Sequence, residues 1–260
     1  MSRLIVITSG KGGVGKTTTA INLGAAINHF GKNVLVIDGN LSTPNIGLHL
    51  NSPDVPVSLN HILLDEAETP EAVYEHDSGM KIMPSSLSIR ELKKIKPERL
   101  KNYKNEFKKI SDYVIVDSAA GLGLEATSAI ELADEIIVVT NPEIPAITDA
   151  LKTIKLAERM KKKVIGVIVT RVKRNKIEAQ PDVVREMLEV PILGMVPEDI
   201  SIAEALSYKD AVIHIYPKSK SARAYKEIAA KIVDVEYDSS QDCEGFFERL
   251  LKRFGVKSKI

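Results

Sequence analysis

One glycine-rich stretch near the N-terminus constrains the fold more than any other segment: Ser9-Gly10-Lys11-Gly12-Gly13-Val14-Gly15-Lys16-Thr17-Thr18. Within it, Gly10, Gly15, Lys16 and Thr17 satisfy the phosphate-binding pattern G-x-x-x-x-G-K-[ST]. The apolar run 4–7 before it is typical of a buried strand, and residues 17–30 after it have the apolar spacing of a helix. A strand, a glycine loop and a helix in this order predict a phosphate-binding loop, or P-loop.

The residue types of this loop predict its chemistry. Gly12, Gly13 and Gly15 let backbone N–H groups approach phosphate oxygens without interference from a Cβ atom. The helix that follows points its positive dipole end at the same anion. We expect Lys16 to reach the β- and γ-phosphates of a nucleotide and the Thr17 hydroxyl to bind Mg²⁺.

Short apolar runs rich in β-branched residues recur along the chain, and a helix-like stretch follows each of them. This alternation predicts a single α/β domain with a doubly wound, mainly parallel sheet and helices on both faces. Ligands of such sheets bind at the carboxyl ends of the strands. The expected strands are 4–8, 34–38, 81–83, 113–117, 136–140, 164–170 and 192–196.

Two of these strands end in a carboxylate that suits a metal site. The strand 113–117 ends in Asp117, which fits a Walker B strand whose aspartate holds Mg²⁺ through water. The strand 34–38 ends in Asp38, which we expect in the outer shell of the same ion. The alternative for Asp38 is an ordinary aspartate that caps the next turn.

The segment 11–18 resembles the deviant Walker A box of the MinD/ParA family of ATPases, and most of the chain is similar to the MinD branch of that family. The resemblance implies ATP and Mg²⁺ as ligands and a homodimer in the ATP-bound state. It also implies that Lys11 crosses the dimer interface to touch the partner's ATP, whereas spacing alone is equally compatible with a solvated loop cation. The implied nucleotide contacts of the loop are Gly10, Lys11, Gly12, Gly13, Val14, Gly15, Lys16, Thr17 and Thr18.

Two further segments resemble the switch regions of this family. Residues 38–45 match the switch I pattern D-x-D-x-x-x-P-N, except that Asn40 replaces the second aspartate. A carboxylate can accept a proton from the attacking water, whereas an amide can only orient it. We therefore expect slow hydrolysis, and the alternative is a crippled one. Residues 118–121 resemble switch II with Ala119 in place of the usual proline, which implies that the Gly121 N–H donates to the γ-phosphate.

Three more loops resemble segments that surround the nucleotide in this family. Asn141 and Glu143 belong to a T-N-P-E match, in which the glutamate reaches the nucleotide or the partner subunit. Arg171 and the run Pro197-Glu198-Asp199 resemble the segments that flank the adenine and the ribose. Because Asn, Pro and Asp also form turns, simple connecting loops are the alternative. The expected catalytic residues are Lys11, Lys16, Asn40 and Asp117.

The composition of the 260 residues, 44% hydrophobic and 27% charged, is ordinary for a soluble domain with a substantial core. The chain shows no N-terminal signal peptide and no apolar run near the ~20 residues that span a bilayer, so we expect a cytoplasmic protein. The single cysteine, Cys243, excludes an internal disulfide and a CxxC metal site. The histidines lack metal-ligand spacing in the sequence: His29, His49, His61, His76 and His214.

We predict three parts: a P-loop ATPase domain (1–233), a polar acidic linker (234–242) and an amphipathic tail (243–260). On a helix the apolar tail residues share one side, and five basic residues against one acidic lie in 246–260. Aromatic residues on a cationic helix suit an anionic membrane surface, and the tail resembles the membrane-targeting C-terminus of MinD proteins. The alternative is a helix docked on the domain or on a partner helix. The expected membrane contacts are Phe246, Phe247, Leu250, Leu251 and Phe254.

Together these patterns predict a MinD-like, Mg²⁺-dependent ATPase that dimerises on ATP and binds the inner face of the cell membrane. There it would position division or other cell-surface machinery through an unidentified activator or recruited protein. One alternative is a ParA-like ATPase that binds DNA nonspecifically, since residues 93–109 hold eight basic and two acidic side chains. We favour the solvated face of a helix for that segment, because lysine-rich helix faces are usually of this kind. Another alternative is a non-hydrolysing, ATP-gated scaffold.

Overall fold

The computed structural model describes residues 2–173 and 178–238. The elements named η are 3₁₀-helices. In chain order the elements are β1 (Arg3–Ser9), α1 (Lys16–His29), β2 (Val34–Gly39), α2 (Ile46–His49), α3 (Leu59–Leu63), η1 (Thr69–Ala72), β3 (Tyr74–Glu75), β4 (Lys81–Met83), α4 (Ile89–Leu92), η2 (Pro97–Tyr103), α5 (Lys104–Ile110), β5 (Tyr113–Ala120), α6 (Leu124–Leu132), β6 (Glu135–Thr140), α7 (Ile144–Arg159), β7 (Lys163–Val172), α8 (Pro181–Leu188), β8 (Ile192–Pro197), α9 (Ile200–Ser207), α10 (Val212–Ile215) and α11 (Lys220–Val233).

One eight-stranded sheet runs through the molecule in the order β3-β4-β2-β5-β1-β6-β7-β8. Neighbouring strands are parallel except for β3 and β4. All of the strands expected from the sequence are present, and the predicted doubly wound α/β fold is confirmed. The strand β3 escapes prediction because its two residues are too few to show a periodic pattern.

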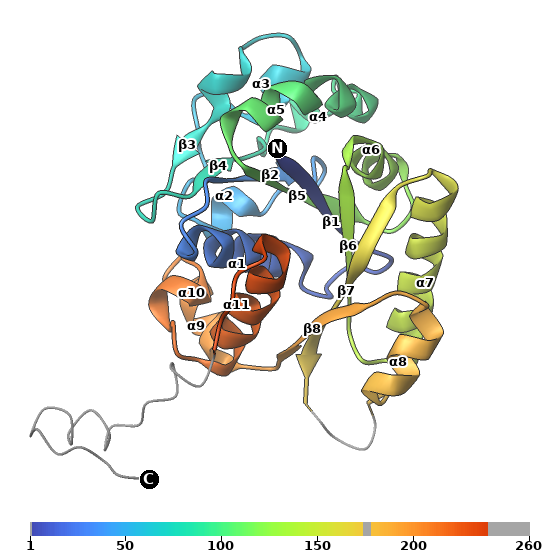
Figure 1. The fold of residues 1–260 in the computed structure, drawn as a ribbon. Coiled ribbons are helices and arrows are strands. Elements are labelled where there is room, and N and C mark those ends of the chain that lie inside the picture. The colour runs from blue at the N-terminus through green and yellow to red at the C-terminus, as the bar shows by residue number, and fades with distance from the viewer. Residues whose placement is uncertain (1, 174–177, 239–260) are drawn as a thin grey trace, which may run out of the picture.

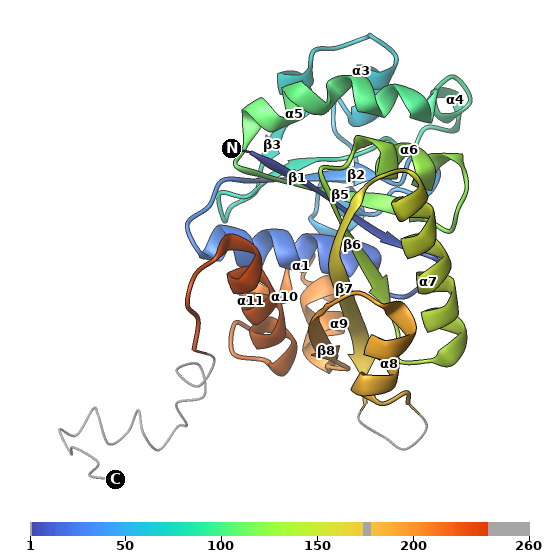
Figure 2. The same ribbon diagram turned by 45° about the vertical axis from the view of Figure 1, so that its right-hand side comes forward.

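Alternate residues of β1 face opposite sides of the sheet, as strand geometry requires. Leu4 and Val6 belong to the core beneath α3, α5, α6, α7 and α8, whereas Ile5 and Ile7 belong to the core beneath α1, α10 and α11. Figures 1 and 2 show these helices on the two faces of the sheet. All four side chains are fully buried. Apolar burial on both faces therefore explains the continuous apolar runs of the central strands.

The strand order reverses at β1, and this reversal positions the site. From β1 the chain moves to β2 on one side, returns to β5, and continues to β6 on the other side. In open α/β sheets the crevice at such a switch point, outside the carboxyl ends of the strands, is where ligands bind. The glycine loop 10–15 follows β1 directly, so it lies between the ends of β5 and β6.

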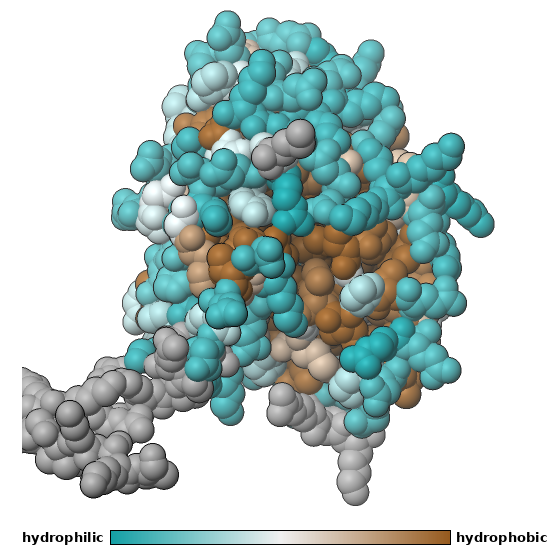
Figure 3. All heavy atoms as spheres, in the orientation of Figure 1, coloured by the Kyte–Doolittle hydropathy of each residue, from teal (hydrophilic) through white to brown (hydrophobic). Residues whose placement is uncertain are grey.

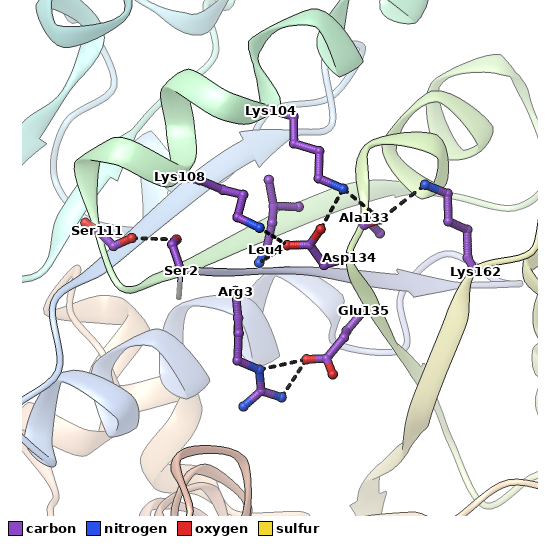
Figure 4. Close-up of polar contacts among 10 residues, drawn as sticks. All are labelled: Ser2, Arg3, Leu4, Lys104, Lys108, Ser111, Ala133, Asp134, Glu135 and Lys162. Atoms are coloured by element: carbon purple, nitrogen blue, oxygen red, sulfur yellow. Dashed lines mark hydrogen bonds and ion pairs between the residues drawn. The ribbon is translucent and has the colours of Figure 1, made fainter.

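The amino ends of the central strands carry a network of ion pairs (Figure 4). Asp134 binds the Nζ atoms of Lys104 and Lys108 at 2.7 and 2.6 Å, and its Oδ2 accepts the Leu4 N–H at 3.1 Å. Partial burial alone would raise the pKa of Asp134, but the two lysines outweigh burial and lower that pKa to about 2. Next to it, Glu135 pairs with Arg3, so this edge is electrostatically satisfied.

The chain stays against the domain beyond α11. The Val235 N–H donates to the Ala230 carbonyl at 3.0 Å, and the ring of Tyr237 lies 5.6 Å from that of Phe30. The first part of the predicted linker therefore contacts the domain. The rest of the linker and the predicted tail lie outside the described residues. No described helix has the length and apolar character that a membrane span requires.

The strand β8 forms one edge of the sheet and leaves Ile192 to Met195 only partly buried. Figure 3 shows apolar surface in the part of this view where β6, β7 and β8 lie in Figure 1. The exposure follows from the edge position, because a strand at the edge of a sheet has a neighbouring strand on one side only.

Candidate nucleotide-binding site

The glycine loop takes backbone conformations that a side chain would resist. Gly13 and Gly15 have φ angles of +78° and +91°, in the left-handed region. A Cβ atom at Gly10 would lie 2.2 Å from the carbonyl oxygen of Asp149 in α7. Because α1 begins directly after the loop at Lys16, the N–H groups of its first turn face the loop. The loop is thus packed against α7 and offers donors to an anion.

Asp117 meets the start of α1 at Thr17. The Thr17 hydroxyl donates to Asp117 Oδ2 at 2.5 Å. Asp117 is fully buried, and its Oδ1 has no hydrogen-bond partner in the described part of the chain. Burial raises the pKa of Asp117 to about 6, although the Thr17 hydrogen bond and the Lys16 charge oppose it. Burial also lowers the pKa of Lys16, and the charge of Asp117 offsets part of that shift.

Asp38 lies beside Asp117, because β2 and β5 pair in register at these two residues. Asp38 is fully buried. Its Oδ2 accepts the N–H groups of Asn45 and Ile46 at 2.8 and 2.9 Å. Burial and then the charge of Asp117 raise the pKa of Asp38 to about 8, in spite of the backbone hydrogen bonds. Two neighbouring carboxylates are therefore held where the charged form is disfavoured.

These groups fit a magnesium ion. Mg²⁺ prefers oxygen ligands and is bound through one or two carboxylates together with phosphates and water. Thr17 offers a hydroxyl, Asp117 offers a carboxylate oxygen without another partner, and Asp38 adds a second negative charge. A bound divalent cation favours the charged form of nearby carboxylates. The structure thus brings together the three residues predicted to hold the metal.

Asn40 lies in a turn that its own side chain closes. Its Nδ2 donates to the Thr43 carbonyl at 2.7 Å, and its Oδ1 accepts from the Thr43 hydroxyl at 3.1 Å. Ser42 in the same turn donates its N–H to Glu125 at the start of α6 at 3.1 Å, and its hydroxyl binds that carboxylate as well. These two hydrogen bonds fix the orientation of the Asn40 amide and leave it one N–H and one lone pair with which to orient a water molecule.

Gly121 is tied to the end of β1. Its N–H donates to the Ser9 carbonyl at 2.8 Å, and its φ of +84° lies in the left-handed region. The predicted donation to a γ-phosphate therefore requires Gly121 to exchange this hydrogen bond. The bond links the second switch segment to the strand end from which the glycine loop starts.

Thr170 in β7 connects the glycine loop to β6 and β7. Its Oγ1 donates to the Val14 carbonyl at 2.6 Å and lies 3.2 Å from the Thr140 carbonyl. The Asn141 side chain donates to the Thr170 carbonyl and hydroxyl at 3.2 and 3.1 Å. Asn141 therefore lies next to the loop, where the sequence predicts it, and its hydrogen bonds fix the position of Thr170.

The outer predicted contacts gather at the ends of β6, β7 and β8. Asn141, Glu143, Arg171 and Glu198 line one surface pocket of about 340 Å³ with Lys173 among their neighbours. Glu198 and Pro197, the last residue of β8, also line an adjoining pocket that reaches α11. The first pocket, which includes Asn141 and Arg171, has room for a base or a ribose.

Asp199 is occupied by structural contacts. Its carboxylate caps α9 by accepting the Ser201 N–H at 3.0 Å. It also accepts the N–H and the hydroxyl of Ser221 in α11 at 3.0 and 2.9 Å. Partial burial would raise the pKa of Asp199, but these hydrogen bonds lower it. The contacts match the turn-forming alternative, and a nucleotide contact of Asp199 stays a prediction.

Lys11, Gly12 and Gly13 are exposed at the tip of the loop, whereas Val14 is buried. The Ser9 hydroxyl donates to the Lys11 carbonyl at 2.8 Å, which fixes the backbone before the tip. Exposure leaves the Lys11 side chain accessible to a second subunit and is equally compatible with a solvated cation. Thr18 follows in the first turn of α1, beside the loop.

Sequence reasoning misses two residues that hold the site in place. Asp149 packs its backbone against Gly10, and Glu125 accepts hydrogen bonds from Ser42. Thr170 is recognisable in the sequence with Arg171 as the polar end of an apolar strand, and it binds the Val14 carbonyl. Nothing in the local sequence identifies Asp149 or Glu125, because each acts on a segment far away in the chain.

A glycine loop between β1 and α1, with two buried carboxylates at neighbouring strand ends, defines a P-loop nucleotide-binding protein. The family model for the CobQ/CobB/MinD/ParA nucleotide-binding domain matches residues 5–212. The chain belongs to this family, whose MinD and ParA members are P-loop ATPases, and the resemblance noted in the sequence is confirmed.

Relatives extend over nearly the whole chain. An uncharacterized ATP-binding protein of Methanocaldococcus jannaschii is 37% identical over 254 residues, which cover 97% of this chain and 96% of that protein. The septum site-determining protein MinD of Bacillus subtilis is 32% identical over 278 residues, covering 99% and 100%. The solved structure of MinD from Pyrococcus horikoshii in complex with Mg-ADP has a TM-score of 0.86 and 33% identity, and it covers 89% of this chain and 96% of that chain.

Proposed function

We propose that this chain is an ATPase of the MinD type that uses Mg²⁺, dimerises when ATP is bound and attaches to the inner face of the cell membrane through its tail. There it recruits a partner protein that positions division or other cell-surface machinery. The observation that carries the nucleotide part is the pair of buried carboxylates, Asp38 and Asp117, beside Thr17 and the glycine loop.

Different residues of the chain bind the phosphates and the metal ion. Lys16 and the N–H groups of the loop hold the phosphates, because they are positive or donating groups at the start of a helix. Thr17 and Asp117 hold the metal, and Asp38 adds charge from the neighbouring strand. Bound Mg²⁺ supplies positive charge between the phosphates and these carboxylates.

Two hydrogen bonds bear on hydrolysis. The Gly121 N–H has to leave the Ser9 carbonyl before it can donate to the reacting phosphate, and the Asn40 amide is held by Thr43. An amide in place of a carboxylate then orients water without accepting its proton. Both features support slow turnover.

Dimerisation is supported by the surface around the loop. Lys11 is exposed at its tip. Three apolar side chains near it are also about half exposed: Leu122 (47%) and Leu124 (55%) follow the second switch segment, and Ile144 (51%) begins α7. Apolar side chains next to an exposed cation suit a surface that closes on a second copy of the chain.

Membrane attachment rests on the composition of the tail. A dozen amphipathic residues are marginal as an isolated helix in water, so a single copy binds lipid weakly. Two copies on one dimer bind with an avidity gain of about 10²-fold or more. ATP would thereby move the protein to the membrane, and hydrolysis would return it to solution.

The ParA-like alternative of nonspecific DNA binding is weakened by ion pairs. In the segment 93–109, Lys104 and Lys108 both bind Asp134, and Lys101 binds Glu131 at 2.8 Å. A lysine that is already paired contributes less to a phosphate-binding surface. The structure therefore favours the solvated-face interpretation of this segment.

Co-sedimentation with anionic liposomes tests the proposal. We expect the protein to pellet with ATP and Mg²⁺ and to stay in solution with ADP. Phe246→Glu should abolish pelleting, whereas Gln241→Glu, which adds the same charge in the predicted linker, should not. Binding that ignores the nucleotide would refute the switch. DNA binding without lipid binding would favour the ParA-like alternative, and membrane binding without ATP turnover would favour the scaffold.

A further inference from the structure

Two histidines that are far apart in the sequence meet beside α10. His76 follows β3, His214 lies in α10, and both contact Asp210. The two imidazole rings are stacked with centroids 5.4 Å apart and planes inclined by 20°. Within the described ranges this is the one group of three or more His, Cys, Asp or Glu residues whose potential ligand atoms all lie within 4.8 Å of one another. The expectation that the histidines are scattered is therefore wrong for this pair.

The distances suit a shared metal ion. His76 Nε2 lies 3.4 Å from Asp210 Oδ1, and His214 Nδ1 lies 2.6 Å from the same oxygen. Zinc bonds of about 2.0–2.1 Å at the tetrahedral angle place two ligands about 3.3 Å apart. The observed separations bracket that value, so small side-chain rotations bring the three groups to one ion. The Ala211 N–H, at 2.6 Å from Asp210 Oδ1, holds the carboxylate in place.

Ser78 supports His76 from the other side of its ring. The Ser78 hydroxyl lies 3.0 Å from His76 Nδ1, and the Ser78 N–H donates to the same nitrogen at 3.2 Å. Metal binding at Nε2 would place the ring proton on Nδ1, which would then donate to the Ser78 hydroxyl and give up the hydrogen bond from the Ser78 N–H. Outer partners of this kind orient metal-bound imidazoles in known sites.

The burial of the cluster leaves room for water. The side chains of His76, His214 and Asp210 are 13%, 20% and 21% exposed. They are buried enough to be held in position and open enough for water to complete the coordination. Two imidazoles and one carboxylate favour zinc, cobalt or nickel over Mg²⁺, which prefers oxygen ligands.

We propose that His76, Asp210 and His214 form a binding site for a divalent transition metal ion, with Zn²⁺ as the best-fitting case, distinct from the Mg²⁺ site of the nucleotide. The ion joins the turn between β3 and β4 to α10. The Val212 N–H of α10 donates to Asn22 Oδ1 of α1 at 2.8 Å. This hydrogen bond connects the metal site to the helix that begins at the P-loop. The site stabilises packing and takes no part in phosphate chemistry.

Calorimetric titration of the full-length chain with Zn²⁺, in excess Mg²⁺ and without nucleotide, tests this site. We expect one tight site per chain and a higher Tm with Zn²⁺. His76→Gln and His214→Gln should each weaken binding at least about tenfold, because loss of an outer partner alone costs about 10–100-fold. Co²⁺ should give visible absorption bands with the wild type that both variants lose.

Two control variants locate the site. His49→Gln removes a partly buried histidine outside the cluster, and Cys243→Ser removes the other residue type that binds zinc well; both should keep wild-type affinity. Circular dichroism and ATP binding check that each variant folds, and Asp210→Asn tests the site again if a histidine variant does not. The proposal is overturned if the wild type binds no Zn²⁺, if Asp210→Asn and the histidine variants that fold bind it as well as the wild type, or if Cys243→Ser abolishes binding.

Discussion

At the amino end of the central strands Asp134 and Glu135 each bind basic side chains, whereas at the carboxyl end Asp38 and Asp117 are fully buried and form no ion pair with any described residue. The pKa of Asp134 is lowered to about 2, and those of Asp38 and Asp117 are raised to about 8 and about 6. Basic side chains of the protein thus stabilise the charged carboxylates at the amino edge of the sheet. At the carboxyl edge a bound ligand must stabilise the charged forms of Asp38 and Asp117.

This contrast separates stability from function within a single sheet. Paired carboxylates at the amino end contribute to folding at neutral pH. Crowded, buried carboxylates at the carboxyl end cost folding free energy, and strongly perturbed groups of this kind mark functional sites. The difference predicts opposite responses of the two edges to mutation and to pH.

The largest expected effect is at Lys16. Lys16→Ala removes the cation at the start of α1, so ATP turnover should fall by about 10²–10³-fold, the scale of losing one electrostatic group from a preorganised site. Steady-state phosphate release measures this. Lys155→Ala, which removes a surface lysine paired with Glu158 and Glu189, should leave turnover unchanged. Equal losses of ATP turnover in both variants would contradict the functional distinction between the carboxyl edge of the sheet and the rest of the surface.

The next largest effect is expected in the way the free energy of unfolding changes with pH when no metal ion is bound. The folded pKa of Asp38, about 8, lies above its ordinary value of 3.8 in an unfolded chain. Its stabilising contribution is therefore complete at low pH and is lost as pH rises through 8. In EDTA, the free energy of unfolding should fall by about 1–2 kcal/mol from pH 6 to 8.

Urea denaturation at several pH values measures this slope. Asp38→Asn should flatten it, and Asp134→Asn should keep it. A wild-type protein whose stability does not change over this range would show that the carboxyl edge is not strained.

A smaller effect is expected in switch I. Asn40→Asp restores a proton acceptor and removes the amide that holds the Thr43 carbonyl, so turnover should rise about tenfold. Asn45→Asp is the matched control, because Asn45 also donates to the Thr43 carbonyl. A rate that does not rise in Asn40→Asp, or that rises as much in Asn45→Asp, would show that Asn40 does not limit hydrolysis.

The smallest effect is at the amino edge. Asp134→Asn should lower the free energy of unfolding at pH 7 by about 1 kcal/mol, after allowance for solvent screening of a partly exposed group. Because the folded pKa of Asp134 is about 2 and its ordinary value in an unfolded chain is 3.8, this contribution is lost as pH falls through that interval. The difference between variant and wild type should therefore shrink below pH 4. A constant difference at all pH values would mean that packing, not charge, is responsible.

The sequence locates the glycine loop and the strand-end carboxylates because each of these parts is local. The loop 10–15, Lys16 and Thr17 are consecutive, and the spacing of glycine and lysine specifies their chemistry. Asp38 and Asp117 are predictable as strand ends, since a parallel sheet brings such ends to one edge. The role of Asp199 is harder to predict from the sequence, because aspartate also caps helices. Here Asp199 caps α9.

What the sequence by itself determined is the fold class, the P-loop and the position of Asp38 and Asp117 at strand ends, because each depends on residues adjacent in the chain or on strand periodicity. Only the tertiary structure decided that Asn40 binds Thr43, that Gly121 binds Ser9, and that His76 meets His214. These contacts depend on how turns and distant segments pack. Residue type and spacing do not encode that packing, because a hydrogen bond or a ligand set needs atoms within a few ångströms regardless of their separation in the chain.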